Sequence, residues 1–360
     1  MDVQPGEYRL IFGGVVLGAA SMPQNSSSIN IATRPNGGMT DLTERIDTSI
    51  MQLVLAGFPH DAIVHHLGKR GVDPCAALEV AIKLENRLGD VANFQAMAQQ
   101  KIHWMASVTR QLRHSSGKPL VEECSKRIEP EVFFERYYFC NRPVVLRNVL
   151  NGWEPFIDIS FTSLLREFSN CLVEVLDNCD SGTDHETDPD KYRRSVLFSV
   201  FVERIMADAT DSVYLVAHNH NLDGALAPLR RRLRNLSGIT SVESDGGVSL
   251  WMGPAGSITN LHYDSVNSLH LQVQGSKRFT LIPPDNSVFV YPYHTFYSRI
   301  NLRSIDTAAF PLFEFADRAE VVLEPGDALF IPVGWWHHVV GLAPTLCFGF
   351  TKFVKPNTYP

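Results

Sequence analysis

Hydrophobic positions in the C-terminal two-thirds of the chain occur in short β-branched and aromatic runs separated by turn residues. This pattern is typical of β-strands, whose side chains alternate between the two faces of a sheet. The predicted strands span residues 144–147, 172–175, 212–216, 249–252, 269–274, 278–283, 319–323, 328–331 and 345–352. Many short strands of this kind favour a mainly β domain built as a sandwich or a barrel.

The segment from residue 39 to residue 115 has a helical period instead. Asp41-Leu42-Thr43-Glu44 carries a capping-box pattern, and apolar residues then recur at roughly helical spacing up to Gly57. Further helices are predicted at about 61–68, 74–88 and 91–112. We interpret residues 39–115 as a small all-α domain for recognition or dimerisation. A DNA-binding helix–turn–helix is the less favoured alternative, because the charge of this segment is mixed.

Residues 1–38 differ in composition from the helices that follow. The stretch 24–38 is rich in Ser, Asn and Gly, which is typical of a disordered leader. The other interpretation of this stretch is that the chain starts at Met39 instead. The apolar run 11–20 leaves a secretory signal peptide as a less favoured interpretation.

The overall composition narrows the class of protein. With 44% hydrophobic and 20% charged residues, the 360-residue chain has the composition of a soluble globular protein. Its formal net charge of -7 argues against general nucleic-acid binding, which needs a basic surface. The six cysteines form no Cys-x-x-Cys pair, and no apolar run is long enough to span a membrane. We therefore expect free thiols in a cytoplasmic protein without membrane contact.

The sequence His262-Tyr263-Asp264 and the run Gly334-Trp335-Trp336-His337-His338 carry the candidate chemistry. On a strand, His262 and Asp264 project to the same face. A histidine from a distant strand would complete two imidazoles and one carboxylate, a ligand set that suits non-haem Fe(II) and leaves coordination positions open. Adjacent strand residues face opposite ways, so only one histidine of the second run can enter the site. A buried ion pair without metal is the alternative interpretation.

Several further motifs accompany these histidines in a fixed order. They are 133–138 (FFERYY), 141–146 (NRPVVL), Gly152-Trp153, 251–256 (WMGPAG), 272–279 (QVQGSKRF) and 323–332 (LEPGDALFIP). With these motifs, residues 128–353 resemble the cupin-like JmjC-type 2-oxoglutarate oxygenases, and in pattern the factor-inhibiting asparaginyl hydroxylase and its bacterial relatives. The resemblance implies a double-stranded β-helix of the jelly-roll kind, here over residues 119–355.

The resemblance also implies cofactors and roles for individual residues. The cofactors are Fe(II) and 2-oxoglutarate, with O2 as the oxidant. His262, Asp264 and His337 match the metal ligands, which favours His337 over His338. Lys277 matches the residue that binds the distal carboxylate of 2-oxoglutarate, and Thr259 and Tyr214 match its hydroxyl partners. A surface lysine and a core tyrosine are the alternatives for Lys277 and Tyr214.

One position departs from the family pattern. The family has an asparagine six residues after the first histidine, whereas this chain has Ser268 there and Asn267 just before it. Either Ser268 replaces the asparagine, or the local register differs. No role is assigned to His270. The long aromatic segment 291–313 is expected to cover the mouth of the site.

The function implied by this resemblance is hydroxylation of an amino-acid side chain in a protein or peptide. The alternatives are a hydroxylase or demethylase that acts on a small metabolite, on modified tRNA or on methyl-lysine, and a non-catalytic cupin that binds a ligand. A homodimer is possible through the helical segment.

Overall fold

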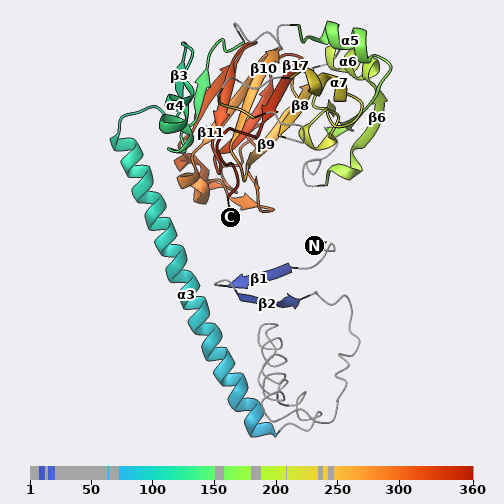
Figure 1. Ribbon diagram of the computed structural model, residues 1–360. Helices are drawn as coiled ribbons and strands as arrows, with labels where there is room; N and C mark the ends of the chain where they lie inside the picture. Colours follow the sequence, from blue (N-terminus) through green and yellow to red (C-terminus); the bar gives the residue numbers. More distant parts are fainter. Residues whose placement is uncertain are drawn as a thin grey trace. The chain divides into compact units, whose positions relative to one another are not determined.

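The structure is a computed structural model that describes residues 8–12, 15–20, 64, 73–150, 158–179, 188–207, 209–233, 238–241 and 247–359. The chain divides into two compact units, residues 1–98 and residues 99–360. Figure 1 shows the elements of both units.

Two six-stranded sheets form the body of the larger unit. The first has the order β3 (Glu122–Cys124), β4 (Val144–Leu146), β15 (Ala328–Ile331), β10 (Ser268–Gln274), β17 (Thr345–Phe350) and β8 (Val248–Gly253). The second has the order β12 (Pro292–Tyr293), β13 (Tyr297–Ser298), β9 (Ile258–Tyr263), β16 (Trp336–Gly341), β11 (Lys277–Ile282) and β14 (Ala319–Leu323). Within these sheets the described strand pairs are antiparallel except β3 with β4, which are parallel.

Successive strands alternate between the two sheets. From β8 to β11, and again from β14 to β17, each strand lies in the sheet opposite its predecessor. This winding is that of a double-stranded β-helix, so the expected mainly β, jelly-roll fold is confirmed. β15 and β17 are buried along their whole lengths, which means that both faces of the first sheet are covered at these strands.

A smaller sheet and several helices surround the barrel. The third sheet has the order β6 (Arg193–Leu197), β5 (Leu172–Asp177) and β7 (Val213–Tyr214). The helices α5 (Phe161–Phe168), α6 (Phe198–Ala207) and α7 (Ala227–Arg232) lie with it beyond β8, at one end of the first sheet (Figure 1). The short helix η5 (Ala217–Asn219) follows β7 after two residues.

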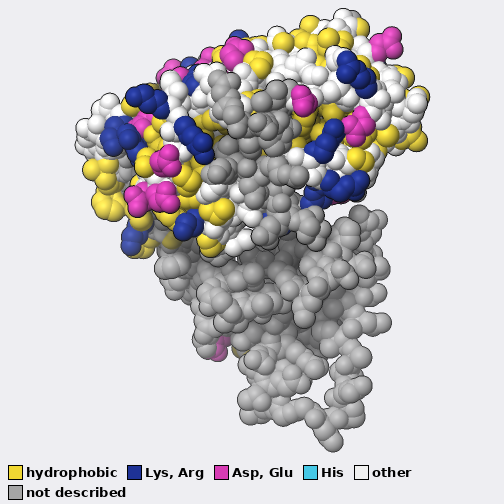
Figure 2. All heavy atoms as spheres, turned by 45° about the horizontal axis from the view of Figure 1, so that its top comes forward, with side chains coloured by type: hydrophobic (Ala, Val, Ile, Leu, Met, Phe, Trp, Pro, Cys, Tyr) yellow, Lys and Arg dark blue, Asp and Glu magenta, His cyan; other side chains and the backbone are white. Residues whose placement is uncertain are grey.

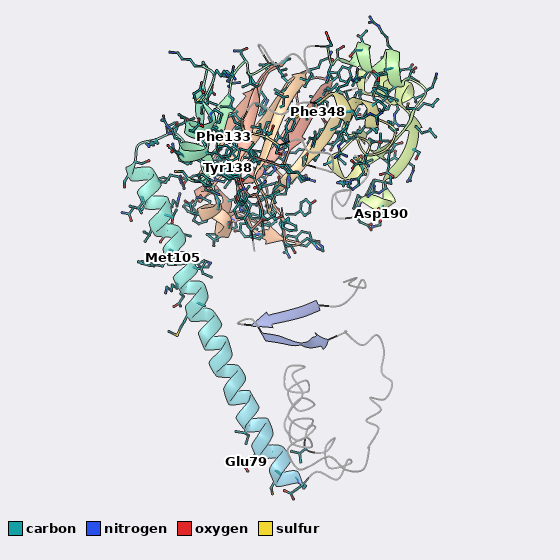
Figure 3. All side chains as sticks on the ribbon, in the orientation of Figure 1. Glu79, Met105, Phe133, Tyr138, Asp190 and Phe348 are labelled. Atoms are coloured by element: carbon teal, nitrogen blue, oxygen red, sulfur yellow. The ribbon has the colours of Figure 1, made fainter. Side chains whose placement is uncertain are left out.

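An aromatic cluster packs the start of this domain against the first sheet. The motif FFERYY forms α4 (Pro130–Phe133) and the π-helical turn η1 (Phe134–Tyr138). Phe133 meets Phe330 edge-on with ring centroids 5.0 Å apart, and Tyr138 stacks on Phe330 at 5.7 Å. Figure 3 shows Phe133, Tyr138 and Phe348 among the packed side chains of the barrel. Such aromatic contacts add to the burial of large apolar surfaces.

The helical segment differs from the sequence prediction. Residues predicted as two helices, 74–88 and 91–112, form one continuous helix, α3 (Pro74–Ser115). The predicted break near Gly89 was wrong, because one glycine costs a helix interior only about 1 kcal/mol relative to alanine. The helices predicted earlier in the chain lie outside the described residues, apart from Val64, which is helical.

Part of the predicted leader also has regular structure. Strands β1 (Tyr8–Phe12) and β2 (Val15–Ala20) pair antiparallel, with Tyr8 opposite Ala20 and Phe12 opposite Val15. The prediction of a leader without regular structure therefore does not hold for these two segments. The rest of residues 1–38 lies outside the described part of the chain.

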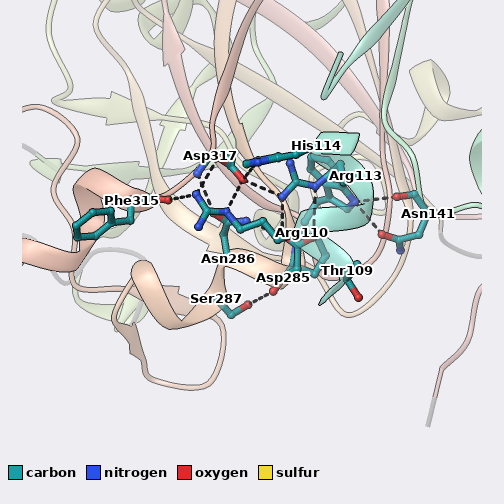
Figure 4. A network of polar contacts seen from close by, with 12 residues as sticks. Thr109, Arg110, Arg113, His114, Asn141, Asp285, Asn286, Ser287, Phe315 and Asp317 are labelled. Atoms are coloured by element: carbon teal, nitrogen blue, oxygen red, sulfur yellow. Dashed lines mark hydrogen bonds and ion pairs between the residues drawn. The ribbon is translucent and has the colours of Figure 1, made fainter. Parts of the chain in front are cut away.

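The last turns of α3 are bound to the barrel by charged side chains (Figure 4). Arg110 contacts Asp317 at 2.8 Å, and Arg113 contacts both Asp285 at 2.8 Å and Asp317 at 2.9 Å. His114 reaches Asp317 at 2.8 Å. The two compact units divide between residues 98 and 99, so this end of α3 belongs to the barrel unit rather than to a separate domain ending at residue 115.

The surface charge and the hydropathy of the described residues do not point to one particular function. On the face drawn in Figure 2, acidic and basic side chains are interspersed among hydrophobic ones. No helix in the described part of the chain combines the length and the hydropathy needed to cross a membrane. The predicted absence of general nucleic-acid binding stays a prediction.

Candidate metal centre and co-substrate cavity

Strands β9 and β16 bring the candidate metal ligands together. They pair antiparallel, with His337 directly opposite His262, and Asp264 follows the end of β9. Asp264 Oδ1 lies 3.9 Å from His262 Nε2, and Asp264 Oδ2 lies 3.8 Å from His337 Nε2. One donor atom from each of the three residues lies within 4.8 Å of the other two. This spacing allows one metal ion to reach all three donors.

The histidine that follows His337 has a different environment. His338 lies opposite Thr280 of β11 and is buried. Burial, followed by the nearby His262 and then by Arg303 and Arg278, lowers its pKa to about 4. It is absent from the group of donor atoms formed by His262, Asp264 and His337. The alternation of side chains along β16 therefore directs His337, and not His338, toward the other two donors.

Backbone carbonyls fix the orientation of both imidazoles. His262 Nδ1 lies 2.7 Å from the carbonyl oxygen of Asn260, and His337 Nδ1 lies 3.0 Å from that of Trp335. Because a carbonyl can only accept, each Nδ1 carries the proton and each Nε2 has a free lone pair. Such hydrogen bonds orient metal-binding histidines and raise their basicity.

The protonation states of His337 and Asp264 suit a divalent cation. Burial, followed by the neighbouring His262, lowers the pKa of His337 to about 3. Burial alone would raise the pKa of Asp264, but the imidazoles of His337 and His262 outweigh it and hold that pKa below its usual value. At neutral pH the site therefore presents a neutral His337 imidazole and an ionised carboxylate. Two imidazoles and a carboxylate fit Fe(II).

A bulge in β9 places Thr259 on the same side of the sheet as His262. The β9–β16 register shifts, so that His337 pairs with His262 whereas Val339, two residues on, pairs with Thr259, three residues back. A bulge of this kind inserts an extra residue into one strand. Thr259 and His262 would face opposite sides of a regular strand, yet both line one cavity with His337 and Val339.

That cavity extends from the ligands to a buried lysine. It has a volume of about 240 Å³ and is lined by the three ligands together with Tyr214, Ala217, His218, Trp251, Thr259, His270, Lys277, Phe279, Tyr297 and Val339. Lys277 Nζ donates a 3.0 Å hydrogen bond to the hydroxyl of Tyr214, and the lysine is only 3% exposed. No carboxylate of the described residues forms an ion pair with it. A buried ammonium without a carboxylate fits an anionic ligand, such as the distal carboxylate of 2-oxoglutarate.

The long aromatic segment contributes one wall. Tyr297 of β13 pairs with His262 of β9, and the two rings lie 5.9 Å apart at an interplanar angle of 31°. From residues 291–313, expected to cover the mouth, Tyr297 is the lining residue that reaches the cavity.

The two candidates for the missing family asparagine face different ways. Asn267 accepts a hydrogen bond from the amide of Val333 at 2.8 Å and donates one to the hydroxyl of Tyr359 at 2.6 Å, which ties the C-terminal tail to the barrel. Ser268 instead hydrogen-bonds His270, which lines the cavity. The structure therefore places Ser268, and not Asn267, beside the site.

Sequence reasoning missed Trp251, Tyr297, His218 and His270 as lining residues. Trp251 belongs to a quoted motif, and the alternation of β8 offered a signal for it. Tyr297 and His218 lie on short segments without a period, so no sequence signal was available for them. His270 was left unassigned, although its position two residues after Ser268 on one strand predicts the same face.

Comparisons with known proteins agree with this geometry. The model of the cupin-like domain family matches residues 130–350, more than half of the chain, and the chain belongs to this family. Its relatives include Jumonji C domain-containing protein 5 of Drosophila melanogaster, 26% identical over 231 residues, which cover 61% of this chain and 57% of that protein. HSPB1-associated protein 1 of Rattus norvegicus is 42% identical over 103 residues, covering 27% and 22%. Lysine-specific demethylase 8 of Xenopus tropicalis is 26% identical over 220 residues, covering 59% and 48%.

The matched segments thus span less than two-thirds of each of these relatives. Within that limit, the comparisons confirm the JmjC-type cupin family expected from the sequence, together with its cofactors Fe(II) and 2-oxoglutarate.

Proposed function

We propose that this chain is an Fe(II)- and 2-oxoglutarate-dependent oxygenase that hydroxylates an amino-acid side chain in a protein or peptide. One observation carries the proposal: a single cavity joins the donor atoms of His262, Asp264 and His337 to the buried Lys277–Tyr214 pair. A metal site and a carboxylate site in one cavity match a co-substrate that binds both.

The chain's own residues have distinct tasks in this scheme. When bound, Fe(II) and the reductant 2-oxoglutarate would activate O2, which supplies the oxidising power, with succinate and CO2 as co-products. His262, Asp264 and His337 hold the metal from one side and leave the side facing the cavity open. Lys277 binds the distal carboxylate of the co-substrate and Tyr214 orients the lysine. The apolar wall formed by Phe279 and Val339 keeps water away from the bound co-substrate.

A second, smaller cavity next to His262 supports a substrate with a neutral target group. It measures about 60 Å³ and is lined by Leu176, Tyr214, Val216, His218, Trp251, Ile258, Thr259, His262 and Tyr297. Among these described lining residues there is no Lys, Arg, Asp or Glu. A cationic side chain would therefore lose its hydration in this cavity, and no carboxylate of the lining would compensate its charge. Asp264, the carboxylate among the proposed metal ligands, is not part of the lining.

Demethylation of methyl-lysine is the second candidate, because one relative carries the name lysine-specific demethylase 8. A methylated ammonium needs free aromatic faces around it. Two aromatic rings of the cavity already lie near a cation, since Lys277 Nζ is 5.4 Å from the Tyr214 ring centre and 5.9 Å from that of Trp251. These two rings are engaged by the lysine and leave fewer free aromatic faces for a methylated ammonium, so hydroxylation is the better-supported reaction.

The test measures succinate release by the full chain, with Fe(II), against a peptide library, and analyses responsive peptides by mass spectrometry. Hydroxylation predicts the gain of one oxygen atom on a responsive peptide. Release of formaldehyde with loss of a methyl group would instead support the demethylase. Turnover confined to metabolites or modified tRNA would contradict a protein substrate, and the absence of any Fe(II)-dependent turnover would favour a non-catalytic cupin.

A further inference from the structure

One histidine lies where the two cavities of the candidate site meet. His218 lines both the cavity of about 240 Å³ that contains the candidate metal ligands and the smaller cavity of about 60 Å³. Five other residues are shared by the two linings: Tyr214, Trp251, Thr259, His262 and Tyr297. The His218 side chain therefore borders both the space for the co-substrate and the space that a target group would occupy.

The backbone of His218 is held by polar side chains that lie outside both linings. Arg193 donates a 3.2 Å hydrogen bond to the carbonyl oxygen of His218 and forms an ion pair with Glu174. The next residue, Asn219, is buried, accepts a 2.8 Å hydrogen bond from the amide of Val216 and donates one of 3.2 Å to Glu174. These contacts fix the short helix η5 and anchor the His218 side chain at the junction of the cavities.

The imidazole of His218 has a hydrogen-bonding atom without a partner. Its Nε2 is buried, and no atom of the described residues hydrogen-bonds it. Buried polar atoms are almost always hydrogen-bonded in folded proteins, so an unpaired one beside a cavity points to a bound group. Burial, followed by Arg193 and His220, lowers the pKa of His218. The ring is therefore neutral at neutral pH and offers one donor and one acceptor.

Most other polar side chains of the smaller cavity already have a partner or a task. Trp251 Nε1 donates a 3.1 Å hydrogen bond to the hydroxyl of Ser249. The Tyr214 hydroxyl belongs to the co-substrate site and His262 to the metal site, and Thr259 matches a partner of 2-oxoglutarate. Among the described residues of this lining, His218 Nε2 is the buried polar atom that is left for the substrate.

We propose that His218 is a specificity-determining residue that hydrogen-bonds the target side chain of the substrate, and that this side chain carries a neutral hydroxyl or carboxamide group. A neutral imidazole suits both groups, because each of them can donate and accept. Since Nε2 is buried, the ring turns about its Cβ–Cγ bond to present a nitrogen to the target group. An aliphatic target would leave the imidazole unpaired, and a charged one would lose its hydration in a lining without Lys, Arg, Asp or Glu.

This inference rests on the proposed function and names the class of its target side chain. The probes are capped peptides with randomised flanks that differ only in the central residue. Threonine is paired with valine and asparagine with leucine, because the members of each pair are similar in shape and differ in hydrogen bonding. Aspartate is the charged counterpart of asparagine. Succinate release by the full chain with Fe(II) and 2-oxoglutarate is measured for each peptide. The ratio within a pair gives the selectivity and does not depend on the overall activity of a variant.

The wild-type chain should favour the polar member of at least one pair by about tenfold or more, because the aliphatic member leaves a buried polar atom unpaired. His218→Leu should bring that ratio close to one, whereas His218→Gln, which keeps a donor and an acceptor, should retain most of it. Calorimetric titration of the Co(II)-loaded protein with 2-oxoglutarate and the favoured peptide, without O2, gives a second readout. There, His218→Leu should weaken binding of the polar peptide more than binding of its aliphatic counterpart.

His220→Asn is the matched control. His220 is exposed and lines neither cavity, and asparagine suits its left-handed backbone with a φ of 53°. This variant also removes an imidazole from the same segment, so it should keep the wild-type ratio. A loss of selectivity in His220→Asn equal to that in His218→Leu would show a general disturbance of the segment and would overturn the proposal.

Equal ratios in the wild-type chain and His218→Leu would also overturn the proposal, as would a wild-type preference for the aliphatic or charged member of every pair. If His218→Leu does not fold, His218→Met takes its place with the same expected and contrary outcomes. A loss of 2-oxoglutarate affinity without any change in the peptide ratio would assign the imidazole to the co-substrate instead. If no peptide gives Fe(II)-dependent succinate release with the wild-type chain, the proposed function itself is contradicted.

Discussion

Lys277 and Tyr214 lie on strands of different sheets, β11 and β7, and meet through a 3.0 Å hydrogen bond in the co-substrate cavity. The pair is buried, and its distance in sequence is 63 residues. The neutral hydroxyl of Tyr214 does not compensate the positive charge of the buried Lys277, whereas a bound anion would. Lys277 should therefore determine the affinity of the cavity for an anionic co-substrate.

Lys277→Ala is expected to weaken 2-oxoglutarate binding steeply while metal affinity stays nearly unchanged. Removing one partner of a buried charge pair costs about 3–5 kcal/mol, or roughly two to four orders of magnitude in affinity. Tyr214→Phe, which keeps the ring and the lysine, should have a smaller effect. Calorimetric titration of the metal-loaded protein measures both. Unchanged affinity in Lys277→Ala would move the carboxylate site elsewhere, with Arg278 the next candidate.

Substitutions in β16 separate the two adjacent histidines. His337→Ala and Asp264→Ala should each abolish Fe(II)-dependent succinate formation, because each removes one of three donors that share a site. His338→Ala should retain most of the metal binding, since His338 pairs with Thr280 of β11 and lies outside the donor group. Metal content after dialysis, measured alongside turnover, checks the assignment. An inactive, metal-free His338→Ala variant beside an active His337→Ala variant would reverse it.

Asp317 is expected to make the stability of the barrel unit depend on pH. Burial would raise the pKa of Asp317, but hydrogen bonds from Arg110, Arg113 and His114 outweigh it and hold that pKa well below its usual value. The resulting stabilisation is fully present above the pKa of an unfolded aspartate and is lost as pH falls toward the folded value. Asp317→Asn should lower the melting temperature at neutral pH and lose less stability than wild type between about pH 5 and pH 3. Parallel losses in the two proteins would show that the contacts in Figure 4 contribute little.

Two truncations test which part of the helical segment is needed for turnover of a macromolecular substrate and which part is needed for stability. Deleting residues 1–98 removes one compact unit but keeps Arg110 and Arg113 on the barrel. This variant should keep peptide-independent, iron-dependent 2-oxoglutarate turnover and lose turnover of a macromolecular substrate, if the removed unit recruits it. Deleting residues 1–115 also removes both arginines, leaves Asp285 and Asp317 without them, and should lower the melting temperature. Full activity on the true substrate after the shorter deletion would contradict a recruiting role.

Much of the fold and of the site was predictable because it depends on local pattern. Strand alternation placed His262 and Asp264 on one face, and the predicted strand cores agree with β4, β8, β10, β11, β14, β15 and β17. The motif order gave the family, and the resemblance implied Lys277, Thr259 and Tyr214, which the structure gathers in one cavity. The helix break predicted near Gly89 was wrong, because a long helix tolerates one glycine and helix propensity is a weak guide at a single position.

The sequence by itself determined which residue types are available and on which face of a regular strand each one lies, because that information is local. Only the tertiary structure decided the contacts that depend on register between distant strands. The bulge in β9 puts Thr259 on the side of His262, against the simple alternation. The β10 register likewise turns Ser268 toward His270 of the cavity and Asn267 toward the C-terminal tail. A bulge or a pairing register is set by hydrogen bonds between strands far apart in the chain, and no local pattern encodes those bonds.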